Sequence, residues 1–90
     1  MRVGTNTIAV EVRSEDDYGP VAETALAAKR SDYFAAGTQV VWDVDVIREG
    51  VIRAHRATAP DAPTVYRRGD RAEAVPALPG WSFPVDDIFD

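Results

Sequence analysis

The segment Thr7-Ile-Ala-Val-Glu-Val-Arg13 decides the fold expected for this chain. Its length and β-branched residues, with apolar side chains on both faces, predict a strand inside a sheet with parallel neighbours, not an edge strand. Glu11 interrupts the apolar run, and because strand side chains alternate, Glu11 and Arg13 are expected on the same face. A buried carboxylate is costly unless it is paired or binds a metal. Glu11 therefore indicates either an ion pair with Arg13 or another neighbour, or a functional site.

A helix is predicted from Pro20 to Ala36, after an acidic turn over residues 14–19. Proline is favoured in the first helical turn and glycine just past the last, which is where Pro20 and Gly37 stand. The carboxylates of the turn suit the positive end of the helix dipole, so a structural role explains them. At ~100° per residue one apolar stripe forms, with Glu23 on the opposite side; its members are Ala22, Ala25, Leu26, Tyr33 and Ala36.

Lys29 falls near the centre of this stripe and is the only lysine in the chain. A lysine there can lay its methylene stem over the core and keep its ammonium group in water. It can also serve a functional site together with Glu11, which is expected on an adjacent element. Core packing is the expected role of Tyr33 and Trp42.

The composition predicts one soluble domain over residues 1–90, with 46% hydrophobic and 28% charged residues. The chain has no cysteine, which excludes disulfides and thiolate metal sites. Its single histidine, His55, argues against a multi-histidine zinc site within one chain. Neither a signal-peptide pattern nor a bilayer-spanning apolar segment is found, so a cytoplasmic location without membrane contact is expected.

The net charge of −5 argues against nucleic-acid binding by the whole surface. A local basic face is compatible with this value. Residues 48–71 contain six arginines against three carboxylates and carry +3, whereas the rest of the chain carries −8. The simpler interpretation of this segment is a solvated hairpin face.

Antiparallel strands are expected after the helix. Thr38–Ile47 should return as Val51–Arg56 after a short turn. Cross-strand charge pairing explains the polar residues of this hairpin, which are Asp43, Asp45, Arg53 and His55. A second hairpin is expected between Thr64–Arg67 and Ala72–Val75.

The remaining segments carry weaker signals. Ala57–Pro63 and Pro76–Val85, both rich in proline, are expected to be irregular. Asp86–Phe89 is expected to form a single helical turn. Together the elements predict the α/β class: a mixed sheet with one buried strand, one helix packed on it and antiparallel strands after it, with helix as a minority of the residues.

Five short motifs occur in order along the chain: Glu-Val-x-Ser at the end of Ile8–Ser14, Lys-x₃-Tyr-x₃-Gly in Lys29–Gly37, Val-Trp-x-x-Asp in Val41–Asp45, Leu-Pro-Gly in Leu78–Gly80, and Ile88–Phe89. This ordered set covers nearly the whole chain. It resembles the C-terminal half of the Uma-two family of restriction endonucleases.

The Uma-two family resembles the PD-(D/E)xK nucleases. These bind Mg²⁺ through an Asp and a Glu-x-Lys motif on neighbouring strands and hydrolyse DNA. The resemblance implies that Glu11 and the backbone carbonyl of Val12 are metal ligands, and that Glu11, Arg13 and Lys29 are catalytic. Arg13 stands at the lysine position of the motif. Because arginine stays charged, the resemblance implies that Lys29 supplies the amine instead.

The catalytic Asp of the family lies on an upstream strand, and no acidic residue precedes Glu11 here. The resemblance therefore implies a restriction-endonuclease-like core truncated at its N-terminal side, with Asp16, Asp17 or Asp45 as candidate substitutes. The implied function is a Mg²⁺-dependent DNA endonuclease that is weak or inactive as a half-length chain. The alternative is a non-catalytic, nuclease-derived module for interaction or dimerisation.

Absence of the upstream strands would leave one edge of the Glu11 strand bare, and soluble proteins cover or pair such edges. A homodimer related by a two-fold axis is the expected solution, and a small domain also benefits from the added burial. Such a dimer could bring a partner carboxylate toward Glu11. DNA is the other expected partner.

Overall fold

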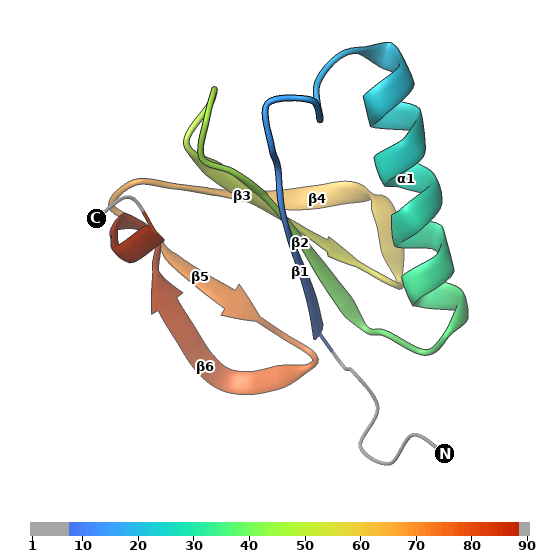
Figure 1. Cartoon of the computed structure of the whole chain (residues 1–90). Helices are drawn as coiled ribbons and strands as arrows, with labels where there is room; N and C mark the ends of the chain where they lie inside the picture. Colours follow the sequence, from blue (N-terminus) through green and yellow to red (C-terminus); the bar gives the residue numbers. More distant parts are fainter. Residues whose placement is uncertain (1–7, 89–90) are drawn as a thin grey trace.

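β2 (Val40–Asp45) is the central strand, and all six of its residues are buried. The computed structural model describes residues 8–88. β2 runs parallel to β1 (Ile8–Val12) on one side and antiparallel to β3 (Val51–Arg56) on the other. β4 (Ala59–Arg67) pairs with β3, so the four-stranded sheet has the order β1-β2-β3-β4 (Figure 1).

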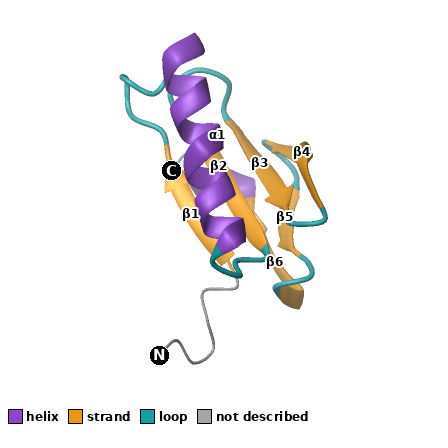
Figure 2. Cartoon of the chain, turned by 90° about the vertical axis from the view of Figure 1, so that its right-hand side faces the viewer, coloured by secondary structure: helices purple, strands orange, loops and turns teal. Residues whose placement is uncertain are grey.

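Different elements cover the two faces of this sheet, as Figures 1 and 2 show. α1 (Pro20–Ala35), which connects β1 to β2, lies over one face. A hairpin of β5 (Arg71–Ala74) and β6 (Leu78–Pro84) lies on the other, followed by the 3₁₀ turn η1 (Val85–Ile88). The predicted α/β class, with one helix and a mixed sheet, is confirmed at this level.

The ends of α1 agree with the predicted signals. Pro20 occupies the first turn, directly after Gly19 with φ 93°. Gly37, just past the helix, has φ 98°, a conformation that side chains other than glycine rarely adopt. The helix ends one residue earlier than predicted. Within residues 8–88 no helix is both long and apolar enough to cross a membrane.

The apolar core lies between the sheet and the hairpin, because alternate residues of each strand point to this side. Its buried members are Val40, Trp42 and Val44 of β2, Ile52 and Ala54 of β3, and Ala72, Ala74 and Val85 of the hairpin and η1. Apolar burial contributes about 25 cal/mol per Å². This side of the sheet therefore supplies most of the hydrophobic stabilisation.

The opposite face of the sheet, beneath α1, carries the buried Val41 and Val51 and a polar layer formed by Glu11, Arg13, Asp43, Asp45, Arg53 and His55. No residue of α1 is buried. The predicted stripe is right for Ala22, Leu26 and Tyr33 and wrong for Ala25 and Ala36, which are exposed. Glu23, expected on the far side, bonds to Arg13. The half-buried residues of α1 are Ala22, Leu26, Arg30, Tyr33 and Phe34.

β1 is an edge strand, so the prediction that it lies inside the sheet is wrong. Within residues 8–88 its only strand neighbour is β2. The N–H of Arg13 donates to the carbonyl of Val44, and by alternation the N–H groups of Val10 and Val12 point away from β2. Val10 and Val12 are 51% and 63% exposed, so the β5–β6 hairpin does not cover the side of β1 on which they lie. The apolar residues on both faces of β1 therefore did not indicate a second strand neighbour.

The predicted second hairpin, between Thr64–Arg67 and Ala72–Val75, is wrong. Thr64–Arg67 is the end of β4, which pairs along β3, and β5 pairs with β6. β4 begins at Ala59, earlier than expected, which makes it long enough to pair along β3.

Two segments predicted to be irregular, Ala57–Pro63 and Pro76–Val85, are largely strand. β4 tolerates its prolines because an edge strand needs no ladder partner on its outer side. The predicted helical turn over Asp86–Phe89 corresponds to η1, and Phe89 lies outside the described residues.

His55 is the one titratable group of the polar layer whose charge can change near neutral pH. Its Nδ1 lies 2.7 Å from the carbonyl oxygen of Pro60, so Nδ1 carries the proton and donates it. Nε2 is buried and has no hydrogen-bond partner among the described residues. Burial lowers the pKa of His55, and the charges of Arg30 and Arg53 act in the same direction, whereas the hydrogen bond to Pro60 and the charge of Asp43 oppose them.

We therefore expect His55 to make the fold sensitive to mild acid. In the unfolded chain its pKa is about 6.5, so below that pH the unfolded state binds a proton that folded His55 resists. The free energy of unfolding should be insensitive to this group above pH ~6.5 and fall below it, by at most about 1.4 kcal/mol per pH unit. Urea unfolding from pH 7.5 to 5.5 measures the slope. A His55→Gln variant with the same slope as the wild type would contradict this assignment.

Candidate functional site

Glu11 and α1 meet at the open side of β1. Glu11 Oε1 lies 2.8 Å from the Nζ atom of Lys29, and the hydroxyl of Tyr33 donates to Glu11 Oε2 at 2.7 Å. Lys29 and Tyr33 are four residues apart, so they share one side of the helix. The predicted proximity of Lys29 and Glu11 is confirmed. Tyr33, expected only to pack, also donates a hydrogen bond here.

The electrostatics of this group keep its ion pair charged. The hydrogen bonds from Lys29 and Tyr33 lower the pKa of Glu11, and the hydrogen bond to Glu11 raises the pKa of Lys29. The side chain of Lys29 is 54% exposed, so its ammonium group is accessible to an anionic ligand.

Arg13 forms a separate cluster on the same face. Its Nε and Nη2 atoms each donate to Asp43 at 2.8 Å, and its Nη1 and Nη2 atoms donate to Glu23 at 2.5 and 2.9 Å. Nη1 also donates to the carbonyl of Asp17 at 2.9 Å. The expected Glu11–Arg13 pair is not formed, because these donors are directed to other oxygens. The hydrogen bonds to Asp43 and, to a smaller extent, to Glu23 raise the pKa of Arg13. The hydrogen bond from Arg13 lowers the pKa of Glu23.

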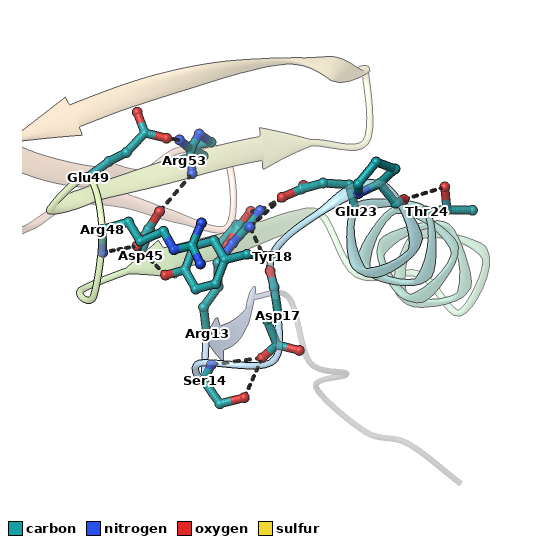
Figure 3. A network of polar contacts seen from close by, with 12 residues as sticks. Arg13, Ser14, Asp17, Tyr18, Glu23, Thr24, Asp45, Arg48, Glu49 and Arg53 are labelled. Atoms are coloured by element: carbon teal, nitrogen blue, oxygen red, sulfur yellow. Dashed lines mark hydrogen bonds and ion pairs between the residues drawn. The ribbon is translucent and has the colours of Figure 1, made fainter.

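A pocket of about 440 Å³ opens beside Arg13, at the carboxyl ends of β1 and β2 (Figure 3). The hydroxyl of Tyr18 donates to Asp45 at 2.5 Å, and the guanidinium of Arg48 lies 4.1 Å from the centre of the Tyr18 ring. Burial and the hydrogen bond to Asp45 raise the pKa of Tyr18 to about 12, so this hydroxyl stays protonated. Arg53 pairs with Glu49 and lies 3.9 Å from Asp45.

The residues brought together do not form a complete Mg²⁺ site. Asp43 is the cross-strand neighbour of Glu11, but Arg13 holds both of its oxygens. Lys29 and Tyr33 hold those of Glu11. No group of three or more possible metal ligands was found among the described residues. A divalent cation at this point would have to displace the cations already present.

Asp17 and Asp45, two of the predicted substitute ligands, are engaged by other groups, although the charge of Asp17 acts on Glu11. Asp17 accepts from the N–H and hydroxyl of Ser14, and Asp45 accepts from Tyr18 and from the N–H of Arg48. The ligand predicted at Val12 is its backbone carbonyl, which by alternation points away from β2 toward the open edge of β1. Asp16, which is exposed, lines a groove that also contains Lys29.

Sequence patterns missed Glu23, Asp43 and Tyr18 as partners in this region. The available signal was Asp43, a carboxylate in an otherwise apolar strand, which could have been matched with Arg13 once the parallel register of β1 and β2 was assumed. Trp42, predicted to pack in the core, is buried there.

No protein-family model and no curated protein sequence matches the chain.

The buried Arg13–Asp43 pair gives a test of this cluster. Arg13→Met should leave the Asp43 charge buried and uncompensated, which costs about 3–5 kcal/mol in comparable pairs. The double variant Arg13→Met/Asp43→Leu should recover part of this loss, because no buried charge is left without a partner. Urea denaturation of the single and double variants measures both values.

Lys29→Met is the matched control, because it removes a cation from a largely exposed pair and should have a much smaller effect. Equal stability of the Arg13→Met single variant and the double variant would show that the buried Asp43 charge is unimportant.

Proposed function

We propose that the chain acts in a DNA endonuclease of the restriction-endonuclease-like type, with its site at Glu11 completed by a carboxylate from outside residues 8–88. The observation that carries the proposal is the 2.8 Å contact between Glu11 and Lys29, with Tyr33 on the second carboxylate oxygen. The motifs that resemble the Uma-two family assign Glu11 and Lys29 to the same site.

The residues around Glu11 supply some of the groups that phosphodiester hydrolysis requires. The reaction needs carboxylates that hold a divalent cation and a positive group that meets the phosphate. Glu11 is a candidate for the first role, and the exposed, charged Lys29 is a candidate for the second. The enclosed position of Arg13 supports a structural role, because its donors are directed to Asp43, Glu23 and the Asp17 carbonyl.

The activity of the chain alone should be weak or absent. The ammonium of Lys29 already neutralises Glu11, and Arg13 neutralises the adjacent Asp43. Mg²⁺ must compete with both unless another carboxylate is added to the site.

Opposite changes in Mn²⁺ affinity are expected from the two residues of the pair. Glu11→Gln removes a ligand and should abolish the weak binding, whereas Lys29→Gln removes the competing cation and should strengthen it. Nicking of supercoiled plasmid, if detectable with Mn²⁺, should fall by about 100-fold or more in Glu11→Gln, as on loss of an essential charged group. Calorimetric titration with Mn²⁺ and gel analysis of the plasmid measure the two effects.

Glu73→Gln is the control, because this exposed glutamate lies in β5, away from Glu11. Absence of both Mn²⁺ binding and nicking at tens of micromolar protein would refute the endonuclease proposal. Robust nicking that requires Glu11 would instead show that the chain needs no additional carboxylate.

A second candidate function, a non-catalytic module for interaction or dimerisation, is favoured by the open edge of β1. Within residues 8–88 the outer edge of this strand has no partner, and Val10 and Val12 beside it are exposed. Exposed edges of this kind pair with other strands. A second copy of the chain, joined β1 to β1 across a two-fold axis, is the simplest occupant.

Sedimentation equilibrium tests the dimer. A dimer is expected at tens of micromolar, and Val10→Lys should dissociate it because charges on edge strands oppose pairing. Val21→Lys, the same substitution at an exposed position of α1, should leave it intact. A wild-type protein that sediments as a single species near 9.8 kDa would refute pairing through β1.

A further inference from the structure

A basic groove lies at the end of the sheet where β2 and β4 terminate. It has a volume of about 400 Å³ and shares Arg48 and Glu49 with the pocket beside Arg13. Three arginines against one glutamate give its lining a charge of +2, in a chain of net charge −5; the lining residues are Val46, Arg48, Glu49, Gly50, Arg67 and Arg68. A local concentration of positive charge attracts anionic ligands.

Neighbouring groups hold the side chain of Arg48 and the backbone of the turn that carries Arg67 and Arg68. Arg48 stacks on Tyr18, which is itself bonded to the buried Asp45, as Figure 3 shows. On the other side of the groove, the turn carrying Arg67 and Arg68 is fixed by two aspartates. Asp70 accepts from the N–H of Arg67 at 2.8 Å, and Asp86 accepts from the N–H of Gly69 at 3.1 Å. Side chains on fixed turns lose less conformational freedom when they bind a ligand.

The positive charges of the groove are only partly neutralised. Among residues 8–88, no carboxylate lies within ion-pair distance of Arg48 or Arg67. Arg68 lies 3.7 Å from Asp86, but both side chains are more than half exposed, and exposed pairs of this kind are weak. Glu49 is itself engaged by Arg53. A phosphate group can therefore compete for Arg48 and Arg67.

The register of the sheet places Arg67, at one side of this groove, on the same face as Glu11. Arg67 pairs with Val51, and Val51 pairs with Asp45, which lies two residues beyond Asp43, the partner of Glu11. Three strand spacings of ~4.8 Å and two residues of ~3.3 Å separate Glu11 from Arg67, or about 16 Å. Phosphates along one DNA strand advance by ~3.4 Å per base, so about five base pairs span both positions.

We propose that the groove of Arg48, Arg67 and Arg68 binds the phosphate backbone of duplex DNA. The choice of DNA among polyanions rests on the proposed endonuclease function, whereas the anion site itself rests on the arrangement of the arginines. Arginine contacts to phosphates position a duplex but carry no sequence information. The groove therefore supplies binding that is independent of DNA sequence.

Fluorescence anisotropy with a labelled 20-base-pair duplex tests the proposal in EDTA, so that no cleavage is needed. The double variant Arg67→Gln/Arg68→Gln should bind at least about tenfold more weakly than the wild type at low salt, and its slope of log K against log salt should be smaller by about 2. Arg30→Gln, which removes a positive charge at the far end of α1, should bind like the wild type. Circular dichroism confirms that each variant is folded, and Arg67→Gln alone replaces the double variant if the latter unfolds.

Binding of the double variant equal to that of the wild type would overturn the proposal, as would an equal loss in Arg30→Gln or failure of the wild type to bind at 50 mM salt. The result is independent of the endonuclease activity. Arginine-dependent DNA binding without plasmid nicking would support the groove and refute the catalytic function. Nicking that is unchanged in the double variant, with unchanged binding, would do the reverse.

Discussion

The arrangement of α1 on the sheet depends on the guanidinium group of Arg13. This group, at the end of β1, donates to Asp43 on β2, to Glu23 on α1 and to the turn between β1 and α1. One buried cation thus connects three consecutive parts of the chain. Arginine suits this position because its planar fork can bind two carboxylates at once and remains charged. A helix with no fully buried residue is positioned here by directional charge pairs together with half-buried side chains such as Leu26 and Phe34.

Local patterns predicted the elements closest to this cluster. The limits of α1 followed from Pro20 and Gly37, and β1 to β3 followed from β-branched runs. The proximity of Glu11 and Lys29 could be predicted because both stood out on adjacent elements. The Arg13 cluster could not, since it depends on strand register and on the rotation of α1. Apolar periodicity placed Ala22, Leu26 and Tyr33 correctly but missed Glu23, because much of the surface under the helix is ionic. The first half of β4 and all of β6 were missed because their prolines resemble loop signals, which edge strands tolerate.

The charged groups form a series across one face of the sheet. Lys29 and Glu11 lie at the open edge, Arg13 with Asp43 and Glu23 comes next, and the Tyr18 pocket leads on to the arginines beyond β3. Most carboxylates of this series already have a cationic partner within the chain, whereas Arg48 and Arg67 have no carboxylate partner among residues 8–88. The face is therefore better prepared for an added anion than for an added cation. This excess of available positive charge is compatible with a phosphate-binding surface on an otherwise acidic protein.

The unequal covering of the two sheet faces has a consequence for how the molecule opens. The hairpin is held by buried apolar area, which weakens on cooling but is little affected by moderate salt, whereas ion pairs near the surface are screened by salt. Proteins unfold locally in units whose opening free energies differ, and units with few buried contacts open first. α1 is such a unit, so its amide hydrogens can exchange with solvent while those of β2 and β3 stay protected. Local opening of α1 would then expose the charged face of the sheet while the apolar core between the sheet and the hairpin stays intact.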